Sequence, residues 1–370
     1  MKKLILSLSL VLLVLASCKK DDTTTPVIDS SLSGDIATNR TLDASVEYLL
    51  SGTVHVKSGA TLTIPAGTVI KAQKGFSSYV MVEQGGKIMA EGTAANPIKF
   101  TSAEASPASS DWGGLIINGK APISAATTGT TAFTEVDNNY KYGGTDVADN
   151  SGVLKYVILE YTGARSSSTQ EHNGLTLNGV GNGTIIENLY VLEGGDDAVE
   201  FFGGSVNITN MLTVNSDDDM FDVTQGWSGT LTNAYGVWAA GYTSSESDPR
   251  GVEADGNFDG LGADHVGQSD FKITNMTIVN NSSFEMQDAI KVRRGAKATI
   301  TNALVKNGKA IDLVDFTDSK GDGKAASSIN VTKTNVTLSG AEIHGTGNVT
   351  ISTTNTGCAA TLFAWTGYTL

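Results

Sequence analysis

Two acidic clusters lie 22 residues apart in the sequence, each directly before a short apolar stretch. One pair of aspartates precedes AVEFF and the other precedes MFDV, and a further carboxylate follows three positions after each pair. Paired carboxyl groups can act as general acid and general base on a glycosidic bond, and larger sets can bind a hard cation such as Ca²⁺. The six residues of this acidic ladder are Asp196, Asp197, Glu200, Asp218, Asp219 and Asp222.

These side chains meet only if the chain superposes residues about 22 positions apart, and the sequence contains a repeat of about that length. An Ile/Leu-x-Asn triplet recurs, with its asparagines at intervals of 22, 23, 42 and 27 residues. The alternation of apolar and polar residues changes phase at each asparagine, which requires a bend in the strand. Asparagine tolerates left-handed backbone angles, and stacked asparagine side chains can bond to each other along a rod. The predicted ladder comprises Asn188, Asn210, Asn233, Asn275 and Asn302.

A second strand follows each triplet, in the stretches from AVEFF to AIDL. Strand alternation predicts that five apolar residues of these strands face inward: Val199, Phe221, Val252, Ile290 and Ile311. The residue that follows each of them is then predicted to face outward. Parallel stacked coils with two or three strands each resemble the right-handed parallel β-helix of the pectate-lyase-like superfamily. The predicted fold class is all-β: a single-stranded right-handed parallel β-helix, which is a solenoid, with loop insertions.

Two regions without repeats, 103–111 and 121–151, are rich in small residues and are predicted to be loops attached to the rod. The carboxy-terminal stretch AATLFAWTGYTL is apolar. A β-helix exposes unpaired strand edges at its ends, so we expect this stretch to cap an open end.

Stacked carboxylates need compensation, because two of them about 4.8 Å apart repel by about 3 to 4 kcal/mol at an effective dielectric constant of about 20. Protonation, backbone donors, a basic neighbour or a bound cation can each supply it. Arg250, Arg293 and Arg294 fall on nearby coils of the repeat, so ion pairing competes with a cation site.

A separate calcium candidate lies in EADGNFDGLGADHVG. Asp255, Asn257 and Asp259 occupy positions 1, 3 and 5 of a loop in which Gly260 permits a sharp turn, and Asp264 follows at position 10. Val266 stands where a bidentate glutamate is expected, so the stretch resembles only the front half of an EF-hand-type loop. An Asx-rich surface turn is the alternative.

Two catalytic alternatives use the acidic ladder. GGDDAVEF resembles the Asp-Asp strand of polygalacturonase-type hydrolases, although the other motifs of those enzymes are missing or distant here. A lyase would pair Ca²⁺ with an arginine base. The residues for such an enzyme are Asp197, Asp219, Asp222 and Arg250.

Aromatic residues in or near the loops could instead form a sugar-stacking platform or pack the loops against the rod. These are Tyr140, Tyr142, Tyr161, Trp227, Trp238 and Tyr242.

The amino terminus has the layout of a lipoprotein signal. Lys2 and Lys3 precede an apolar stretch too short to span a bilayer comfortably, and LASC resembles the bacterial lipobox, which implies lipidation of Cys18. The predicted organisation is a signal peptide over 1–17, a lipidated cysteine with a flexible tether over 18–33, and the β-helix over 34–370. Cys358 is then the only remaining thiol, and we expect it to be buried.

Loss of Lys2 and Lys3 with the signal changes the formal charge from -14 to -16. This charge argues against nucleic acid as a partner. The phrases GATLTIPAGTVIKA, DWGGLIINGKAPIS and GGDDAVEFFGG, together with KKDD after Cys18, resemble a family of Bacteroidetes surface lipoproteins with a predicted β-helix. That resemblance implies an outer-membrane lipoprotein facing the cell exterior, with a periplasm-facing lipoprotein as the alternative, and it assigns no activity.

Three function classes follow from the sequence. The leading hypothesis is non-catalytic binding of an extracellular glycan or another surface ligand, with Ca²⁺ as the candidate cofactor. The second is a polysaccharide hydrolase or lyase of pectinase-like type. The third is a passive structural or coat lipoprotein.

Overall fold

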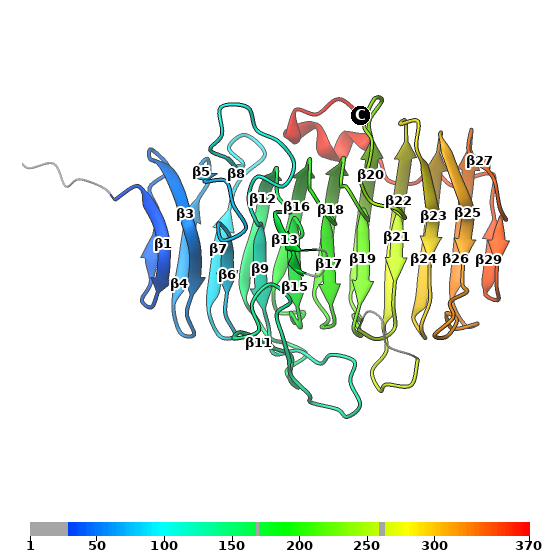
Figure 1. Cartoon of the computed structure of the whole chain (residues 1–370), viewed down its shortest axis with the longest axis horizontal. Helices are drawn as coiled ribbons and strands as arrows, with labels where there is room; N and C mark the ends of the chain where they lie inside the picture. The colour runs from blue at the N-terminus through cyan, green and yellow to red at the C-terminus, as the bar shows by residue number, and fades with distance from the viewer. Residues whose placement is uncertain (1–28, 168–169, 259–262) are drawn as a thin grey trace, which may run out of the picture.

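The chain forms a rod of stacked coils (Figure 1). The computed structural model describes residues 29–167, 170–258 and 263–370. In these residues 25 strands join one continuous sheet, and its pairings from coil to coil are parallel, as between β16 and β18. The prediction of an all-β parallel β-helix is therefore confirmed. The predicted signal, Cys18 and all but the last residues of the tether lie outside the described residues.

One side of the rod carries the strands that follow the acidic clusters. We call it the first side. Its strands are β1 (Ser31–Ile36), β3 (Glu47–Val56), β6 (Val80–Val82), β9 (Leu115–Asn118), β15 (Leu175–Asn178), β17 (Val199–Phe202), β19 (Phe221–Thr224), β21 (Val252–Ala254), β23 (Glu285–Lys291), β25 (Lys309–Asp315), β27 (Thr337–Leu338) and β28 (Ile343–His344). Because β1 begins at Ser31, the rod starts three residues before the predicted boundary.

The other 13 strands of the sheet build the rest of each coil. They are β2 (Arg40–Thr41), β4 (Thr61–Pro65), β5 (Val69–Ala72), β7 (Lys87–Glu91), β8 (Ile98–Ser102), β12 (Gly152–Glu160), β16 (Ile185–Leu192), β18 (Asn207–Val214), β20 (Thr230–Trp238), β22 (Asp270–Asn280), β24 (Lys297–Lys306), β26 (Ser328–Thr334) and β29 (Asn348–Ile351). Five of these strands, β16, β18, β20, β22 and β24, each bend at one asparagine.

The five asparagines of the repeat stack at this bend. Each has a left-handed backbone with φ between 54° and 61°. The Nδ2 atoms of Asn210, Asn233, Asn275 and Asn302 each donate to the Oδ1 atom of the asparagine one coil earlier, at 2.8 to 2.9 Å. Asn188, at the start of the ladder, accepts the bond from Asn210. The ladder satisfies polar groups at a corner that an apolar side chain could not satisfy.

Apolar side chains fill the interior of the rod. Trp227 lies between Phe201 and Phe271, with ring centroids 4.0 and 5.6 Å away. Trp227, Trp238 and Tyr142 are buried to within 1% of complete burial. A sugar-stacking platform that includes these three residues is therefore excluded, because their rings belong to the core.

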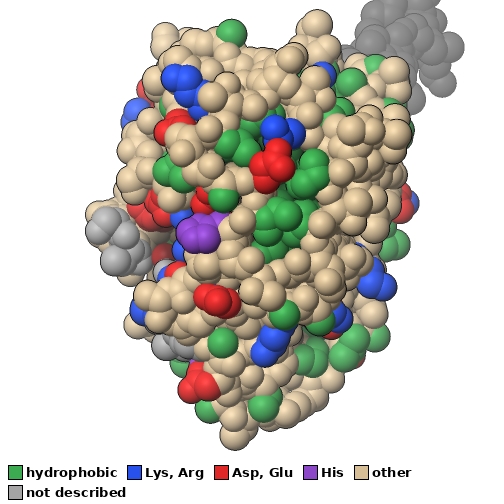
Figure 2. All heavy atoms as spheres, turned by 90° about the vertical axis from the view of Figure 1, so that its right-hand side faces the viewer, with side chains coloured by type: hydrophobic (Ala, Val, Ile, Leu, Met, Phe, Trp, Pro, Cys, Tyr) green, Lys and Arg blue, Asp and Glu red, His purple; other side chains and the backbone are tan. Residues whose placement is uncertain are grey.

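The carboxy-terminal segment does not cap the rod. Its 3-10 helix η1 (Ala360–Thr366) lies against the middle strands, far from β29 (Figure 1). Phe363 is buried beside Tyr235, and Trp365 packs edge-on against Tyr156. The end at β29 keeps hydrophobic side chains in view (Figure 2). The prediction of an end cap is wrong, because the segment covers apolar side chains on the outer face of β16, β18 and β20, among them Tyr190, Leu212 and Tyr235.

The predicted register is wrong in the last coils. Ile290 pairs with Val314 and not with Ile311, and Lys291 pairs with Asp315. The similarity of AIKV to AIDL suggests the wrong alignment, because β23 and β25 each extend to seven residues and the register follows the whole strand.

The predicted loop at 121–151 carries a small hairpin of β10 (Ala132–Phe133) and β11 (Lys141–Tyr142), and a second hairpin joins β13 (Arg165–Ser167) to β14 (Gln170–Glu171). Cys358 is buried as expected, and burial raises the pKa of its thiol to about 12. The described residues contain no helix long and apolar enough to cross a membrane.

Candidate functional site

Acidic side chains form an outward column on the first side of the rod. Glu200 of β17 pairs in register with Asp222 of β19, which pairs with Glu253 of β21. The position before Glu200 in the same column is Thr176, so the charge begins in the middle of the rod. Because side chains alternate along a strand, all three carboxylates point to the same outer face.

The turns before these strands carry the paired aspartates. Asp197 Oδ1 accepts a hydrogen bond from the backbone N–H of Asp219 at 2.8 Å, and Asp219 Oδ1 accepts one from the backbone N–H of Arg250 at 2.6 Å. Asp197 is 7% exposed and Asp219 is 2% exposed. Each carboxylate thus bonds to the equivalent position of the next coil. The structure therefore brings together the two clusters that the repeat predicts to be neighbours.

Two sets of carboxylates converge closely around Asp197. One contains Asp196, Asp197 and Asp218, and the other contains Asp197, Glu200 and Asp222; one oxygen from each member lies within 4.8 Å of the others in its set. Glu200 Oε2 also accepts from Asn173 Nδ2 at 2.6 Å. Within the described residues, Asp218 Oδ1 is buried and accepts no hydrogen bond. Oxygen ligands at this density are the kind that Ca²⁺ takes in proteins.

A cleft of about 300 Å³ opens over these carboxylates. Its lining has ten carboxyl groups, two guanidinium groups and two phenyl rings. These belong to Glu135, Glu171, Asp196, Asp197, Glu200, Asp218, Asp219, Asp222, Asp248, Glu253, Arg250, Arg293, Phe202 and Phe258. We call this the acidic cleft.

Burial changes the acidity of the carboxyl groups in the acidic cleft. Desolvation, reinforced by neighbouring carboxylates, holds the pKa values of Asp196, Asp197, Glu200 and Asp219 well above their ordinary range. Desolvation and the charge of Asp248 raise the pKa of Asp218 to about 7. Without a cation, the cleft therefore retains protons near neutral pH.

The arginine of the catalytic alternative is held by ion pairs. Arg250 contacts Glu253, lies 2.9 Å from Asp248, and places Nε 3.2 Å from Asp288. Desolvation lowers the pKa of Arg250, but the charges of Asp219, Asp248 and Asp288 outweigh it and leave the pKa above its ordinary value. A guanidinium held in this way cannot serve as a proton-abstracting base, so the geometry does not favour Arg250 in that role.

The candidate calcium loop has other partners at its start. Asp255 lies 2.7 Å from Arg293 Nε and 2.8 Å from Arg294 Nη1, and Asn257 Oδ1 accepts from Ser124 Oγ at 2.7 Å. Asp259 lies outside the described residues, and Asp264 is exposed. Asp255 and Asn257 are thus bonded to other side chains, and a calcium site in this loop stays a prediction.

Four acidic residues of the cleft are missing from the candidate site predicted by the repeat. Glu253 and Asp248 flank Arg250, and the outward position of Glu253 was the available signal. Glu135 and Glu171 come from the two hairpin regions, which follow no repeat. Only the folded chain places these two beside the ladder.

A family model described as the pectate-lyase-like β-helix domain matches residues 34–367. No curated protein matches the chain significantly. Among solved structures, the catalytic domain of a GH87 α-1,3-glucanase with nigerose aligns at 14% identity and a TM-score of 0.29, over 83% of this chain and 63% of that domain. An alginate lyase from Paenibacillus sp. str. FPU-7 aligns at 12% identity and a TM-score of 0.31, over 82% of this chain and 98% of the lyase.

The chain thus spans less than two thirds of the glucanase domain. At these identities the likeness concerns the fold alone and assigns no substrate. The family match covers nearly all of the rod, and the chain belongs to the family of pectate-lyase-like β-helix domains.

Proposed function

We propose that the protein is a non-catalytic binder whose acidic cleft takes a divalent cation of the Ca²⁺ type and, through it, a hydroxyl-rich ligand such as an extracellular glycan. The observation that carries the proposal is the convergence of two carboxylate sets that share Asp197, with oxygens within 4.8 Å of one another. A cation would replace the protons that desolvation otherwise retains there.

The cleft also offers contacts for a sugar. Phe258, which packs against the buried ring of Phe202, provides apolar surface beside the carboxylates, and apolar surface next to polar groups suits the two faces of a sugar ring. Ca²⁺ takes six to eight oxygen ligands, so hydroxyl groups can complete a shell begun by carboxylates.

The test is glycan binding with and without the cation. A glycan array probed with the chelated protein and again with added Ca²⁺ should give binding only in the second case. Asp197→Asn should abolish it, whereas Asp270→Asn, on an exposed residue paired with Lys297, should not. Binding that ignores Ca²⁺ would contradict the role of the cation, and no binding in either case would leave a structural coat protein as the better account.

A polysaccharide hydrolase is the second candidate, and one observation favours it. The pKa of Asp218 near 7 would leave a proton on this carboxyl group, as a general acid requires. In the same cleft, desolvation is outweighed by the charge and hydrogen bond of Arg250, which lower the pKa of Asp248, so a proton donor would lie near an ionised carboxylate. Incubation with neutral and acidic polysaccharides should then release reducing ends, and Asp218→Asn should stop the release. Absence of release from every polysaccharide counts against the hydrolase.

The proposal includes surface attachment through lipid on Cys18. Acyl chains bury methylene groups at about 0.8 kcal/mol each, so two or three chains hold a protein to a membrane without a spanning helix. Labelling of cells with a palmitate analogue should mark the protein, and Cys18→Ser should remove the label. Protease added to intact cells should digest the rod if the anchor faces outward.

A further inference from the structure

A second pocket lies on the same rod and has the opposite charge. It has a volume of about 480 Å³ and opens where β3, β6 and β9 end, beneath the β10–β11 hairpin. Its charged lining residues are Lys57, Lys120, Lys141 and Glu83, so cations outnumber acids three to one. The acidic cleft carries eight more carboxyl groups than guanidinium groups, and an anion would be repelled there. We call the second pocket the lysine pocket.

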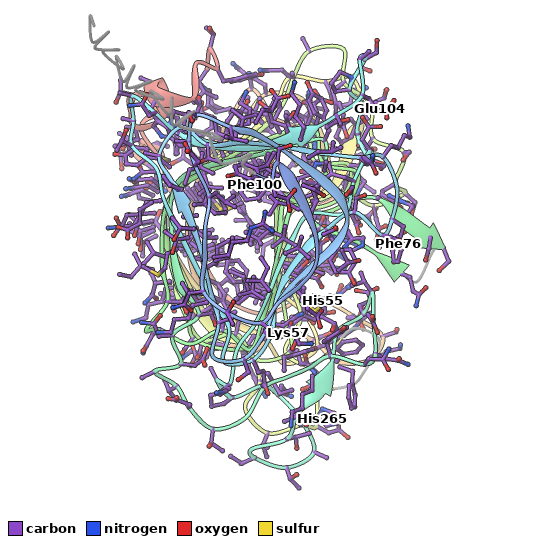
Figure 3. The ribbon with its side chains drawn as sticks, turned by 90° about the vertical axis from the view of Figure 1, so that its left-hand side faces the viewer. His55, Lys57, Phe76, Phe100, Glu104 and His265 are labelled. Atoms are coloured by element: carbon purple, nitrogen blue, oxygen red, sulfur yellow. The ribbon has the colours of Figure 1, made fainter. Side chains whose placement is uncertain are left out.

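The walls of the lysine pocket are fixed by hydrogen bonds. Gln84 Nε2 donates to the carbonyl oxygens of Gly119 and Gly143 at 2.7 and 2.9 Å, which ties the turn after β9 to the end of the hairpin. The Tyr140 ring stacks on His55 with centroids 4.4 Å apart, and Lys57 Nζ lies 5.6 Å from the centre of that ring. His55 and Lys57 both lie on the part of the coil nearest the loops that extend from the rod (Figure 3).

A buried amide in this pocket still has protons to donate. Asn118 is fully buried and lines the pocket. Its Oδ1 atom accepts from Asn178 Nδ2 at 2.8 Å, whereas its Nδ2 atom has no hydrogen-bond partner among the described residues. Leaving a buried donor without a partner is unfavourable, so a ligand oxygen that accepts from this amide would gain affinity.

Two of the three lysines of the pocket are also available to bind an anion. Lys57 lies 2.6 Å from Glu83 Oε1, but Lys120 and Lys141 form no ion pair with a described residue. Lysine acts as a compact point charge, whereas planar carboxylates are bound in two-pronged fashion by arginine, and no arginine lines this pocket in the described chain. Ammonium groups with one amide donor suit a tetrahedral oxyanion better than a carboxylate.

An aromatic edge completes the pocket. Phe133 is 57% exposed, and Tyr140 presents its ring next to it on the same hairpin. Exposed aromatic rings beside polar groups favour ligands that have a ring with an apolar face. We propose that the lysine pocket binds the sulfate or phosphate ester of a sugar. This inference goes beyond the proposed function and does not require the acidic cleft to be occupied.

Calorimetric titration with single sugars tests the proposal. The probes are glucose 6-sulfate and glucose 6-phosphate, with glucose and glucuronate as comparators. We expect an ester to bind with a dissociation constant of about 1 mM or below and the comparators to bind at least tenfold more weakly. A preference between the two esters identifies the source of the oxyanion. Binding should weaken as salt is raised.

Variants connect the binding to the pocket. Asn118→Asp keeps the oxygen that Asn178 bonds and replaces the free donor with a negative oxygen, so it should reduce ester affinity at least tenfold. Lys141→Gln, on an exposed residue, should do the same without risk to the fold. Lys155→Gln, which removes an exposed pair with Glu187, is the matched control and should change nothing.

The outcome is separable from that of the acidic cleft. Asp197→Asn should leave ester binding intact even if it abolishes cation-dependent glycan binding. Equal or tighter binding of glucuronate would overturn the proposal. So would the absence of ester binding at about 10 mM, or Asn118→Asp and Lys141→Gln variants that bind like the parent protein.

Discussion

The carboxylate of Asp197 accepts a hydrogen bond from the backbone N–H of Asp219, one coil further along the rod, at 2.8 Å. This bond fixes the side chain of one acidic cluster on the backbone of the next. It also explains how carboxylates can be stacked at the spacing of β-strands, because a backbone donor lowers part of the repulsion between them. The remaining charge in the acidic cleft is what a proton or a cation must neutralise.

Neutralising Asp197 alone should separate cation binding from folding. In Asp197→Asn the amide oxygen can still accept from Asp219 N–H, but the charge shared by both carboxylate sets is lost. We expect Ca²⁺ affinity to fall at least tenfold, which is about 1.4 kcal/mol, while the melting temperature without the cation stays equal or rises. Calorimetric titration and thermal unfolding measure the two effects. A lower melting temperature without cation would mean that the charge itself supports the fold.

The stability of the chelated protein should fall as pH rises from about 4 to about 7. The pKa of Asp218 rises from 3.8 to about 7 on folding, mainly through desolvation, and the pKa values of Asp196, Asp197 and Asp219 also rise. In this window the four folded carboxyl groups hold protons that the unfolded chain has lost, whereas burial lowers the pKa of His172 to about 4 and opposes the trend with one proton, so raising the pH favours unfolding in sum.

Melting curves at pH 5 and pH 7.5 in chelator should differ by a few degrees, with the higher value at pH 5. Added Ca²⁺ should reduce or reverse the difference, since it binds the ionised carboxylates. A chelated protein more stable at pH 7.5 than at pH 5 would contradict the raised pKa values.

The asparagine corner should be sensitive to backbone freedom as well as to hydrogen bonding. Asn233 has φ of 59°, donates to Asn210 and accepts from Asn275. Asn233→Ala should cost about 2 to 4 kcal/mol of unfolding free energy, because it loses both bonds and puts alanine, which tolerates left-handed backbone angles less well than asparagine, at this position.

Asn233→Gly separates the contribution of the hydrogen bonds from that of backbone strain. Glycine adopts this backbone conformation readily, so this variant loses only the bonds. We expect glycine to cost about 1 kcal/mol less than alanine in denaturant unfolding. Equal losses would show that backbone strain at the corner is unimportant.

The carboxy-terminal segment should be separable from the rod. Phe363 is 1% exposed against Tyr235, whereas Leu362 is 38% exposed. Phe363→Ala should make residues after β29 sensitive to limited proteolysis, because it removes the main buried contact of η1. Leu362→Ala is the control and should leave the cleavage pattern unchanged. In both variants the rod itself should resist cleavage.

The repeat in the sequence was sufficient to predict the parts of the site that follow it. The interval between Asp197 and Asp219, together with the phase change at Asn188 and Asn210, specifies a coil length, and a solenoid then stacks equivalent residues. Glu135 and Glu171 reach the acidic cleft from hairpin regions, whose position depends on tertiary packing and not on periodicity. The same limit applies to Lys141 and Tyr140 in the lysine pocket.

The errors have physical causes too. Ile311 occupies the same place in its short motif as Ile290, but β25 contains further apolar residues, and Val314 is the one that pairs with Ile290. The apolar carboxy terminus predicts a cap on an open end, but hydrophobicity alone does not choose between an end and a side of the rod. The segment packs on the side of the rod, against the apolar outer face around Tyr235.

Calorimetric titration of Ca²⁺ into the chelated protein at pH 7.5 is the most direct test of the acidic cleft. We predict saturable binding that is lost in Asp197→Asn and retained in Asp270→Asn, an exposed carboxylate elsewhere on the rod. Binding that survives Asp197→Asn unchanged, or no binding of Ca²⁺ to the parent protein, would contradict the account.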